Sequence, residues 1–260
     1  MLPEQEARIG ITEPGVVYGE GCFETLKVTK GRPRFFEDHW QRFTNSTSAV
    51  GIRIEASKES VFQQAIELAL RNGIQSGVLR ISCHQLFEGA SLLVQATPPR
   101  RHPLPKSFQV QFSNWQHPGL SPHSSIKHNN YARFRAAFRE AIEAGYDEAL
   151  LLDARGHVIE GAVSNLFWVD ASGQLNSPSL NAGALPGIIR NKLIGLFPAI
   201  IECEPSKDLL LQAREIFLAN SLLEIMPVAQ LEDYPLPACP GEITQKVIES
   251  FYDAYPETDN

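Results

Sequence analysis

Lys127 is the residue of this sequence whose chemistry is easiest to specify. It is one of eight lysines and lies between a polar loop and an amphipathic segment that begins at Tyr131. The positive end of a helix dipole disfavours an ammonium ion, so a lysine just ahead of a helix is expected to have a lowered pKa. A neutral lysine amine is what Schiff-base chemistry needs. Judged by position alone, a solvent-facing lysine is the commoner alternative.

Glu160 is a second candidate, because it interrupts the apolar, strand-like run from His157 to Asp170. A carboxylate in such a run must point to water or meet a partner inside the protein. A protonated pyridine nitrogen would be such a partner. Taken alone, the residue favours the alternative of a surface position at a bulge near Gly161.

An anion site is indicated where Pro186 and Gly187 directly precede a predicted helix. The first turn of a helix exposes backbone N–H groups that lack intrahelical partners and can bind phosphate, although many helices begin this way without a ligand. Ser221, just past a predicted strand, could donate its hydroxyl to the same anion. Arg42 follows His39 by one helical turn and could pair with a phosphate, with a surface ion pair as the alternative.

Composition and missing motifs argue against several other functions. The net charge of −7 argues against a surface for nucleic acid or anionic membranes. No run of about 18 apolar residues is present, and the N-terminus lacks a signal-peptide pattern, so a cytoplasmic location is expected. The sequence contains no phosphate-loop, nucleophile-elbow or zinc-protease motif. The cysteines lack the spacing of a metal site and are expected to be reduced thiols: Cys22, Cys83, Cys203 and Cys239.

Hydrophobic periodicity predicts the elements that must position these residues. Helices are predicted from Glu37, over Ser60–Asn72, over Tyr131–Ile142, after Pro186 and over Glu242–Tyr252. Strands are predicted over Phe23–Val28, Gly77–His84, Ala90–Ala96, Ser107–Trp115, Glu148–Asp153, His157–Asp170 and Glu215–Ala219.

The proline-rich segment 99–106 predicts a linker between a small N-terminal domain, 1–98, and a larger C-terminal domain, 107–260, that carries Lys127. The 260 residues are sufficient for two hydrophobic cores. Short strands and separate helices, without regular βαβ alternation, favour two α+β domains over a doubly wound sheet.

Taken together and in order, these segments resemble the class-IV aminotransferase family, the fold-type-IV group of pyridoxal-phosphate (PLP) enzymes that includes D-amino-acid aminotransferase. The resemblance extends from Tyr18 to Val228. Its motifs are Tyr18-Gly-Glu-Gly-Cys-Phe-Glu-Thr25, His39-x-x-Arg42, Ile126-Lys127-His-Asn-Asn-Tyr131, Asp147-Glu148-Ala149, Glu160-Gly-x-x-Ser164-Asn165-Leu-Phe167, Leu185-Pro-Gly-Ile-Ile-Arg190 and Glu215-Ile-Phe-Leu-Ala-Asn-Ser221.

The resemblance implies an α+β fold of two domains with PLP between them, usually in a homodimer. It implies that Lys127 forms the Schiff base with PLP and later moves the proton. Glu160 would bind the pyridine nitrogen and keep it protonated, so that the ring withdraws electrons. The remaining cofactor contacts that it implies are Arg42, Gly187, the amides of Ile188 and Ile189, and Ser221 at the phosphate, with Ser164 and Asn165 at the cofactor edge.

Two departures from the family pattern concern binding. Ile189 stands where many relatives have threonine, so only its amide can reach the phosphate. The segment Arg80-Ile-Ser-Cys-His84 lacks the arginine that relatives often place after I-S or I-T to bind a substrate carboxylate. Strand alternation is expected to point Arg80 elsewhere. His84 is then a candidate receiver, and Phe23 is a second candidate substrate contact.

Three functions remain open. The short chain, Gly21-Cys22-Phe23 and Lys127-His128-x-Asn130 are more similar to 4-amino-4-deoxychorismate lyases, which give p-aminobenzoate and pyruvate. The second is an aminotransferase on D-amino acids, branched-chain amino acids or amines, which would use the same cofactor residues. The third is a non-catalytic protein of the same fold that binds a phosphate ligand, which the presence of both Lys127 and Glu160 disfavours.

Overall fold

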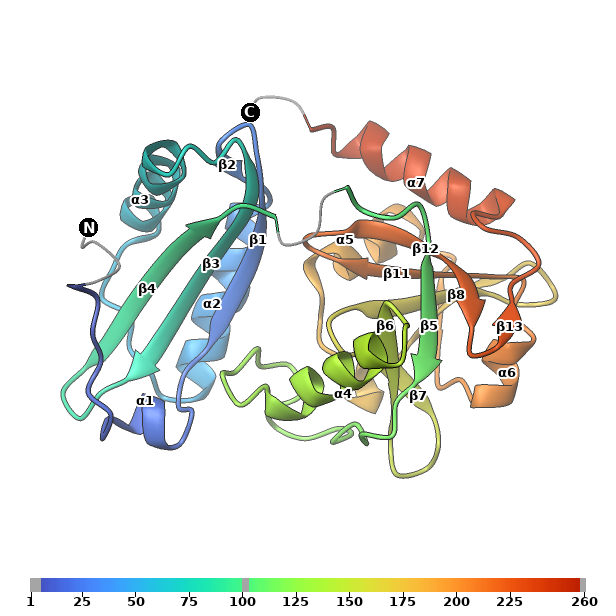
Figure 1. The fold of residues 1–260 in the computed structure, drawn as a ribbon, viewed down its shortest axis with the longest axis horizontal. Helices are drawn as coiled ribbons and strands as arrows, with labels where there is room; N and C mark the ends of the chain where they lie inside the picture. Colours follow the sequence, from blue (N-terminus) through green and yellow to red (C-terminus); the bar gives the residue numbers. More distant parts are fainter. Residues whose placement is uncertain (1–5, 100–102, 258–260) are drawn as a thin grey trace. The chain divides into compact units, whose positions relative to one another are not determined.

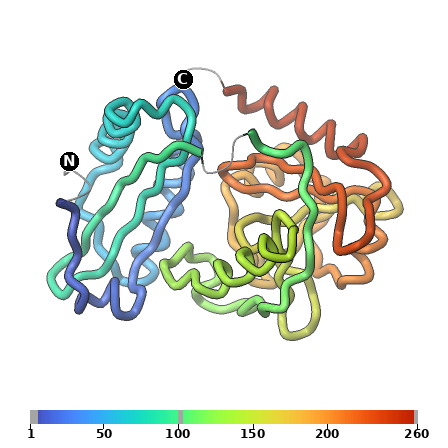
Figure 2. Tube along the Cα trace, viewed as in Figure 1, coloured from blue at the N-terminus to red at the C-terminus, as the bar shows by residue number. Residues whose placement is uncertain are grey.

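The chain divides into two compact units in the computed structural model, which describes residues 6–99 and 103–257 (Figures 1 and 2). The first unit comprises residues 6–99 and Ile126–Tyr131, and the second comprises Pro103–Ser125 and residues 132–257. Each unit has its own sheet, helices and apolar core. The predicted α+β class is confirmed.

The first unit is a four-stranded antiparallel sheet in the order β2-β1-β3-β4. Its strands are β1 (Phe23–Thr29), β2 (Arg32–Pro33), β3 (Ser76–Gln85) and β4 (Ala90–Thr97). Its helices are α1 (Pro14–Val17), α2 (Phe36–Ala49) and α3 (Lys58–Arg71). Alternation along β1 buries Leu26 and Val28 in a core with Phe43 of α2 and Val61 of α3. Because β-strand side chains alternate between faces, Phe23 and Thr25 lie on the opposite face of the sheet.

The second unit contains a nine-stranded sheet in the order β10-β9-β8-β11-β12-β5-β6-β7, with β13 paired to β12. Its strands are β5 (Phe108–Phe112), β6 (Glu148–Leu152), β7 (Val158–Gly161), β8 (Asn165–Val169), β9 (Leu175–Pro178), β10 (Ile201–Cys203), β11 (Glu215–Asn220), β12 (Glu224–Leu231) and β13 (Tyr234–Pro235). Its helices are α4 (Ala132–Glu143), the 3-10 turn η2 (Leu180–Ala182), α5 (Ile188–Leu196), α6 (Lys207–Leu211) and α7 (Glu242–Ala254).

The helices of the second unit cover its sheet at two places. Helix α4 packs on β6, and α5 and α7 pack on β11 and on each other. On one face of β8 and β11, the rings of Phe167 and Phe217 stack with centroids 4.9 Å apart. The other face of the same strands buries Leu166 and Trp168 beside Ile216. Both faces of β8 and β11 are therefore buried, which explains the apolar runs Leu166–Val169 and Ile216–Ala219 within them.

Most predicted elements are present with ends shifted by a few residues, but two predictions are wrong in an informative way. The run His157–Asp170 is two strands, β7 and β8, because the chain turns at 162–164, where Gly161 N donates to Ser164 O at 2.7 Å. The strand predicted over Ser107–Trp115 ends at Phe112. Strands β2, β9, β10, β12 and β13 are not predicted from the sequence, since they are short or lack a clear period.

The segment Ile126–Tyr131 belongs to the first unit, so the prediction that Lys127 lies in the C-terminal domain is wrong. Phe23 N donates to Lys127 O at 2.9 Å, and Asn129 N donates to Gly21 O at 2.8 Å. The Asn129 side chain also donates to Cys83 O at 2.9 Å. These bonds attach the segment to the ends of β1 and β3, a long-range pairing that sequence distance does not indicate. Residues 100–102 of the predicted linker lie outside the described residues.

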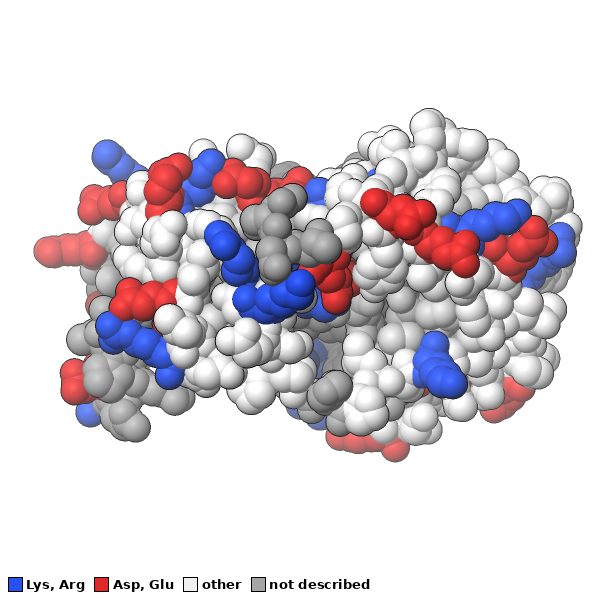
Figure 3. All heavy atoms as spheres, turned by 90° about the horizontal axis from the view of Figure 1, so that it is seen from above, with Lys and Arg blue, Asp and Glu red and all other residues white. Residues whose placement is uncertain are grey.

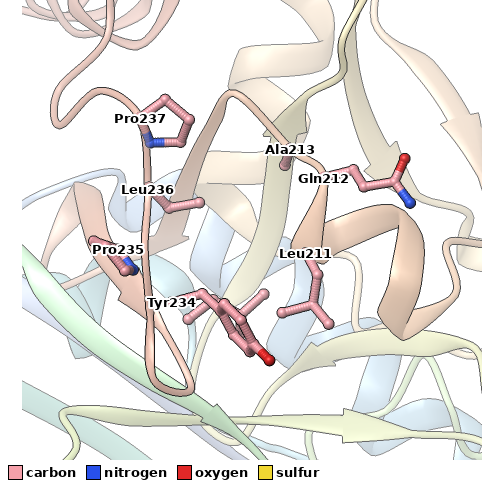
Figure 4. A pocket seen from close by; sticks show the side chains of 8 residues that line it. Leu211, Gln212, Ala213, Tyr234, Pro235, Leu236 and Pro237 are labelled. Carbon is pink, nitrogen blue, oxygen red and sulfur yellow. The ribbon is translucent and has the colours of Figure 1, made fainter.

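The surface of the described residues carries acidic and basic side chains interspersed on the face seen in Figure 3. No helix in the described part of the chain is long and apolar enough to cross a membrane. An apolar hollow in the second unit is bordered by Leu211 at the end of α6 and by Tyr234 and Leu236 near β13 (Figure 4). It contains none of the residues that the sequence analysis selected, so the candidate site is a different region.

Candidate functional site

Lys127 lies beside two aromatic rings of the first unit. Its Nζ is 4.6 Å from the ring centroid of Phe23 and 5.2 Å from that of Tyr131. The two rings meet edge to face with centroids 5.4 Å apart. Ring faces attract a cation at such distances. The helix predicted from Tyr131 begins at Ala132, so Lys127 lies five residues before its start.

Arg80 lies on the same side of the sheet as Phe23, and the expectation that it points elsewhere is wrong. Its Cζ is 3.9 Å from the Phe23 ring centroid. In the register of β1 and β3, Phe23 is opposite Ser82 and Thr25 is opposite Arg80. Because β-strand side chains alternate with a period of two, residues 80, 82 and 84 share one face. A guanidinium and the Lys127 amine therefore both contact the Phe23 ring.

His84 is on the face of β3 that it shares with Arg80, at the end nearest the Lys127 segment. Its Nδ1 lies 3.4 Å from Asn129 Nδ2, and its side chain is partly buried. A Cβ built on Gly15 of α1 would lie 2.7 Å from His84 Cβ. His84 is therefore packed against α1 and lies beside the segment that carries Lys127.

Arg42 is held by a buried carboxylate of the same unit. Arg42 Nε and Nη2 donate to Glu24 Oε1 and Oε2, each at 2.7 Å. His39 Nδ1 is 2.6 Å from Glu24 Oε2, and both side chains are almost completely buried. Glu24 therefore fixes the direction of the guanidinium. A phosphate contact for Arg42 stays a prediction.

The ion pair sets the titration of Glu24. Burial alone would raise the pKa of Glu24, but the charge and hydrogen bonds of Arg42, together with His39, lower it to about 2. Burial lowers the pKa of His39, while its hydrogen bond to Glu24 acts in the opposite direction. The sequence pattern around Glu24 indicates that this residue is buried, although Glu24 is not among the predicted site residues. A carboxylate falls on the apolar side of an alternating strand, where it needs a partner.

Glu160 is buried on β7, so the surface position that the residue alone favoured is wrong. Its Oε2 accepts from Leu185 N at 3.0 Å and from Asn165 Nδ2 at 3.3 Å. Its Oε1 is 3.2 Å from His117 Nε2. Within the described residues no lysine or arginine pairs with Glu160. The carboxylate therefore has directed hydrogen-bond donors but no cationic side chain beside it.

His117 is a site residue that the sequence analysis missed. It lies past the end of β5, and its Nδ1 accepts a hydrogen bond from Gly119 N at 3.0 Å. A nitrogen that accepts from an N–H carries no proton, so the proton of the neutral ring is on Nε2, which faces Glu160. No motif or period in the sequence indicates this contact, because His117 and Glu160 are 43 residues apart.

Ser164 is hydrogen-bonded to a second buried carboxylate, that of Glu148. Its hydroxyl donates to Glu148 Oε2 at 2.9 Å, and Ala162 N and Val163 N donate to the same side chain. Burial raises the pKa of Glu148 to about 7 despite these donors. Ser164 thus holds the turn between β7 and β8 in place. Its predicted role at a cofactor edge stays a prediction.

The N-terminus of α5 is fixed by Asn165, which donates to Leu185 O at 2.9 Å. Gly187 is the N-cap residue, and within the described residues no side chain caps this helix. The first-turn amides of Ile188 and Ile189 have no intrahelical acceptors. A Cβ on Gly187 would lie 1.9 Å from Asn165 Oδ1, so only glycine fits here without movement.

Ser221 follows β11, whose Ala219 is directly opposite Asn165 of β8. Asn220 shapes the turn by accepting from Leu222 N and Leu223 N, and its side chain donates to Val163 O at 3.1 Å. The turn with Ser221 is therefore bonded to the turn between β7 and β8.

The predicted site residues are divided between the two units. The first unit carries Phe23, Arg42, His84 and Lys127, and the second carries Glu160, Ser164, Asn165, Gly187, Ile188, Ile189 and Ser221. Within the second unit, hydrogen bonds join Glu160, Asn165 and the start of α5.

Residues 21–231 match the sequence family described as Amino-transferase class IV. The aminodeoxychorismate lyase of Bacillus subtilis is 27% identical over 262 residues, which cover 94% of this chain and 88% of that protein. The Escherichia coli branched-chain amino acid aminotransferase structure has a TM-score of 0.89 at 23% identity, covers 100% of this chain and 94% of that chain, and shows the same fold. A T.th. branched-chain amino acid aminotransferase, solved with N-(5'-phosphopyridoxyl)-L-glutamate, has a TM-score of 0.84 at 26% identity, with coverages of 97% and 90%.

Replacing Glu24 by glutamine should destabilise the protein by about 3 kcal/mol at neutral pH, because it leaves the Arg42 charge without its buried partner. The folded-state pKa of Glu24, about 2, lies below its ordinary value of 4.5. The stabilisation is therefore complete above pH 4.5 and is lost as the pH falls towards 2. Urea unfolding of wild type and Glu24→Gln between pH 2.5 and 7 measures this. Glu37→Gln, at an exposed pair with Lys58, is the control. A stability difference that does not shrink with acid would contradict the assignment.

Replacing Gly187 by alanine should destabilise the second unit by about 1–3 kcal/mol, because the new Cβ must displace the Asn165 side chain. The matched control is Gly195→Ala in the same helix, where a Cβ meets nothing within 4 Å. That change should be neutral or slightly stabilising, since alanine favours helix. Equal urea midpoints for the two variants would show that the contact with Asn165 is not restrictive.

Proposed function

Because this chain belongs to the class-IV aminotransferase family, we propose that it is a PLP-dependent enzyme acting on amino groups, and specifically a 4-amino-4-deoxychorismate lyase. The family consists of PLP-dependent transaminases and lyases, and the reaction proposed here yields p-aminobenzoate and pyruvate.

The observation that carries the cofactor proposal is the set of donors around Glu160. The described donors to this buried carboxylate are all neutral, so a cationic group is a favourable next partner for it. A protonated pyridine nitrogen is such a group, and it also donates a hydrogen bond. The fit agrees with the phosphopyridoxyl compound bound by the T.th. branched-chain amino acid aminotransferase.

The other end of the cofactor fits the start of α5. The uncapped amides of Ile188 and Ile189 supply N–H donors for a phosphate, and Ser221 can add a hydroxyl. Arg42, oriented by Glu24, supplies the positive charge that we assign to the same phosphate. Lys127 supplies the amine for the cofactor aldehyde and then moves the substrate proton. When bound, PLP supplies an electron-withdrawing ring that stabilises negative charge on the substrate.

The lyase assignment depends on the residues around Lys127. Gly21-Cys22-Phe23 and Lys127-His128-x-Asn130 are similar to the lyases, and the structure bonds these two segments to each other through Phe23 N and Lys127 O. The Bacillus subtilis lyase is similar over 94% of this chain. In this reaction Lys127 removes the ring proton, and pyruvate leaves as the ring becomes aromatic.

An aminotransferase on branched-chain amino acids, D-amino acids or amines is the second candidate, since branched-chain aminotransferases are also relatives. It uses the same cofactor contacts and differs in needing a keto acid as amino acceptor. A non-catalytic protein that binds a phosphate ligand is disfavoured, because such a protein has no need of Lys127 and a buried Glu160.

We assign the substrate carboxylate to Arg80 and keep His84 as a second contact. The Arg80 guanidinium and the Lys127 amine lie on one aromatic ring, that of Phe23. A guanidinium can bind a carboxylate with two parallel hydrogen bonds. A homodimer and a cytoplasmic location stay predictions of the sequence analysis.

The lyase is tested by supplying the PLP-loaded protein with 4-amino-4-deoxychorismate in the absence of any keto acid. We expect p-aminobenzoate, followed by its fluorescence, with wild type, and no product with Lys127→Ala. No product from wild type that has visibly bound PLP would eliminate the lyase. Amino-group transfer from D- or L-amino acids to 2-oxoglutarate or pyruvate would then support the second candidate.

Replacing Arg80 by glutamine should raise KM for the carboxylate substrate roughly tenfold to a hundredfold, because one charged hydrogen bond contributes about 1.5–3 kcal/mol. The affinity for PLP should stay unchanged. Arg71→Gln, at an exposed pair with Glu67 on α3, is the control. An unchanged KM in Arg80→Gln would transfer the assignment to His84, for which His84→Gln is the next variant.

A further inference from the structure

Glu160 has two differently supported oxygens. Oε2 accepts from Leu185 N at 3.0 Å and from Asn165 Nδ2 at 3.3 Å. Leu185 lies three residues before α5, and Asn165 is the first residue of β8. Oε1 has a single described donor, His117 Nε2, at 3.2 Å. A carboxylate can accept about four hydrogen bonds. The carboxylate therefore has room for one further donor, and its rotation depends on the contact to His117.

His117 is itself fixed from three directions. Its backbone N donates to Leu152 O at 2.7 Å, on the strand that pairs with β7. Its Nδ1 accepts from Gly119 N at 3.0 Å, and its ring packs at 73° against Phe134 of α4 with centroids 5.7 Å apart. Only 3% of the residue is exposed. A ring flip would put Cδ2–H opposite Gly119 N–H and Cε1–H opposite Glu160, so the two hydrogen bonds select the present orientation.

The charge of the donor matters as well as its direction. With Nδ1 occupied as an acceptor, His117 directs an N–H at Glu160 without bringing a positive charge. A lysine or arginine in this place would form an ion pair and neutralise the carboxylate. A neutral donor orients the oxygen and leaves its charge for a ligand.

We propose that His117 is a positioning residue that holds Glu160 as the hydrogen-bond acceptor for the protonated ring nitrogen of the cofactor. This inference rests on the proposed function, because it takes Glu160 to contact that nitrogen. His117 acts through Glu160 and does not itself touch the cofactor. Its effect is therefore confined to ligands that carry the ring nitrogen.

A pair of ligands measures this effect directly. The cofactor-free form of each variant is titrated with PLP and with the analogue in which CH replaces the ring nitrogen. Each titration gives the dissociation constant of that variant for that ligand. The ratio of the two constants reports the contact to the nitrogen, because every other contact is common to both ligands. Urea unfolding of each cofactor-free variant checks that it is folded.

The variants are Glu160→Gln, His117→Phe and His117→Gln. We expect wild type to prefer PLP, and His117→Phe to lose roughly tenfold or more of this preference, as for a buried hydrogen bond to a charged group. His117→Gln, whose amide can still donate to Glu160, should recover most of it. His157→Phe is the control, because His157 is a partly exposed histidine of the same unit that pairs with Glu204. It should keep the wild-type ratio.

Failure of the inference can be told apart from failure of the proposed function. A His117→Phe variant that keeps the wild-type ratio, even with weaker binding of both ligands, shows a purely structural role and overturns the inference. If Glu160→Gln also keeps the ratio, the assignment of Glu160 to the ring nitrogen is wrong and the inference fails with it. Loss of the ratio in Glu160→Gln alone leaves the proposed function intact and rejects only His117.

Discussion

A carboxylate that leaves water must be given hydrogen-bond donors, and both units of this protein are organised around that requirement. Glu24 of β1 is held by Arg42 and His39, which fixes α2 against the sheet of the first unit. Glu148 accepts from the turn between β7 and β8, and Glu215 accepts from Ile243 N and Thr244 N at the start of α7. Each of these carboxylates joins segments that are distant in sequence.

Glu160 differs from Glu24 in the charge of its partners. The bidentate contact with Arg42 gives Glu24 a cationic partner inside the first unit. The described donors to Glu160 are a backbone amide, an asparagine and a neutral imidazole. A buried carboxylate without a cationic side chain beside it is a candidate for a ligand contact. In the proposed function, the cationic ring nitrogen of the cofactor would lie at Glu160 of β7 and its anionic phosphate at the start of α5.

In the first unit, the Lys127 amine and the Arg80 guanidinium lie at the same aromatic ring, that of Phe23. Lys127 reaches Phe23 only because the segment Ile126–Tyr131 bonds to the ends of β1 and β3. Arg80 reaches the same ring because of the register of β1 and β3. Ser82 is opposite Phe23, and Arg80, two residues before Ser82, points to the same face of the sheet. Strand register therefore decides which side chain of β3 lies near the amine. One residue of slip would turn Arg80 to the core.

The sequence by itself determined the family and the α+β class, because the family motifs are local and their order along the chain is specific. Hydrophobic periodicity also located most helices and strands. Tertiary structure alone decided that Lys127 belongs to the first unit, that His157–Asp170 turns back on itself, that Arg80 faces Phe23 and that His117 supports Glu160. These facts depend on strand register and on hydrogen bonds between residues tens of positions apart. Such contacts leave no periodic trace in the sequence, because one side chain is enough to make each of them.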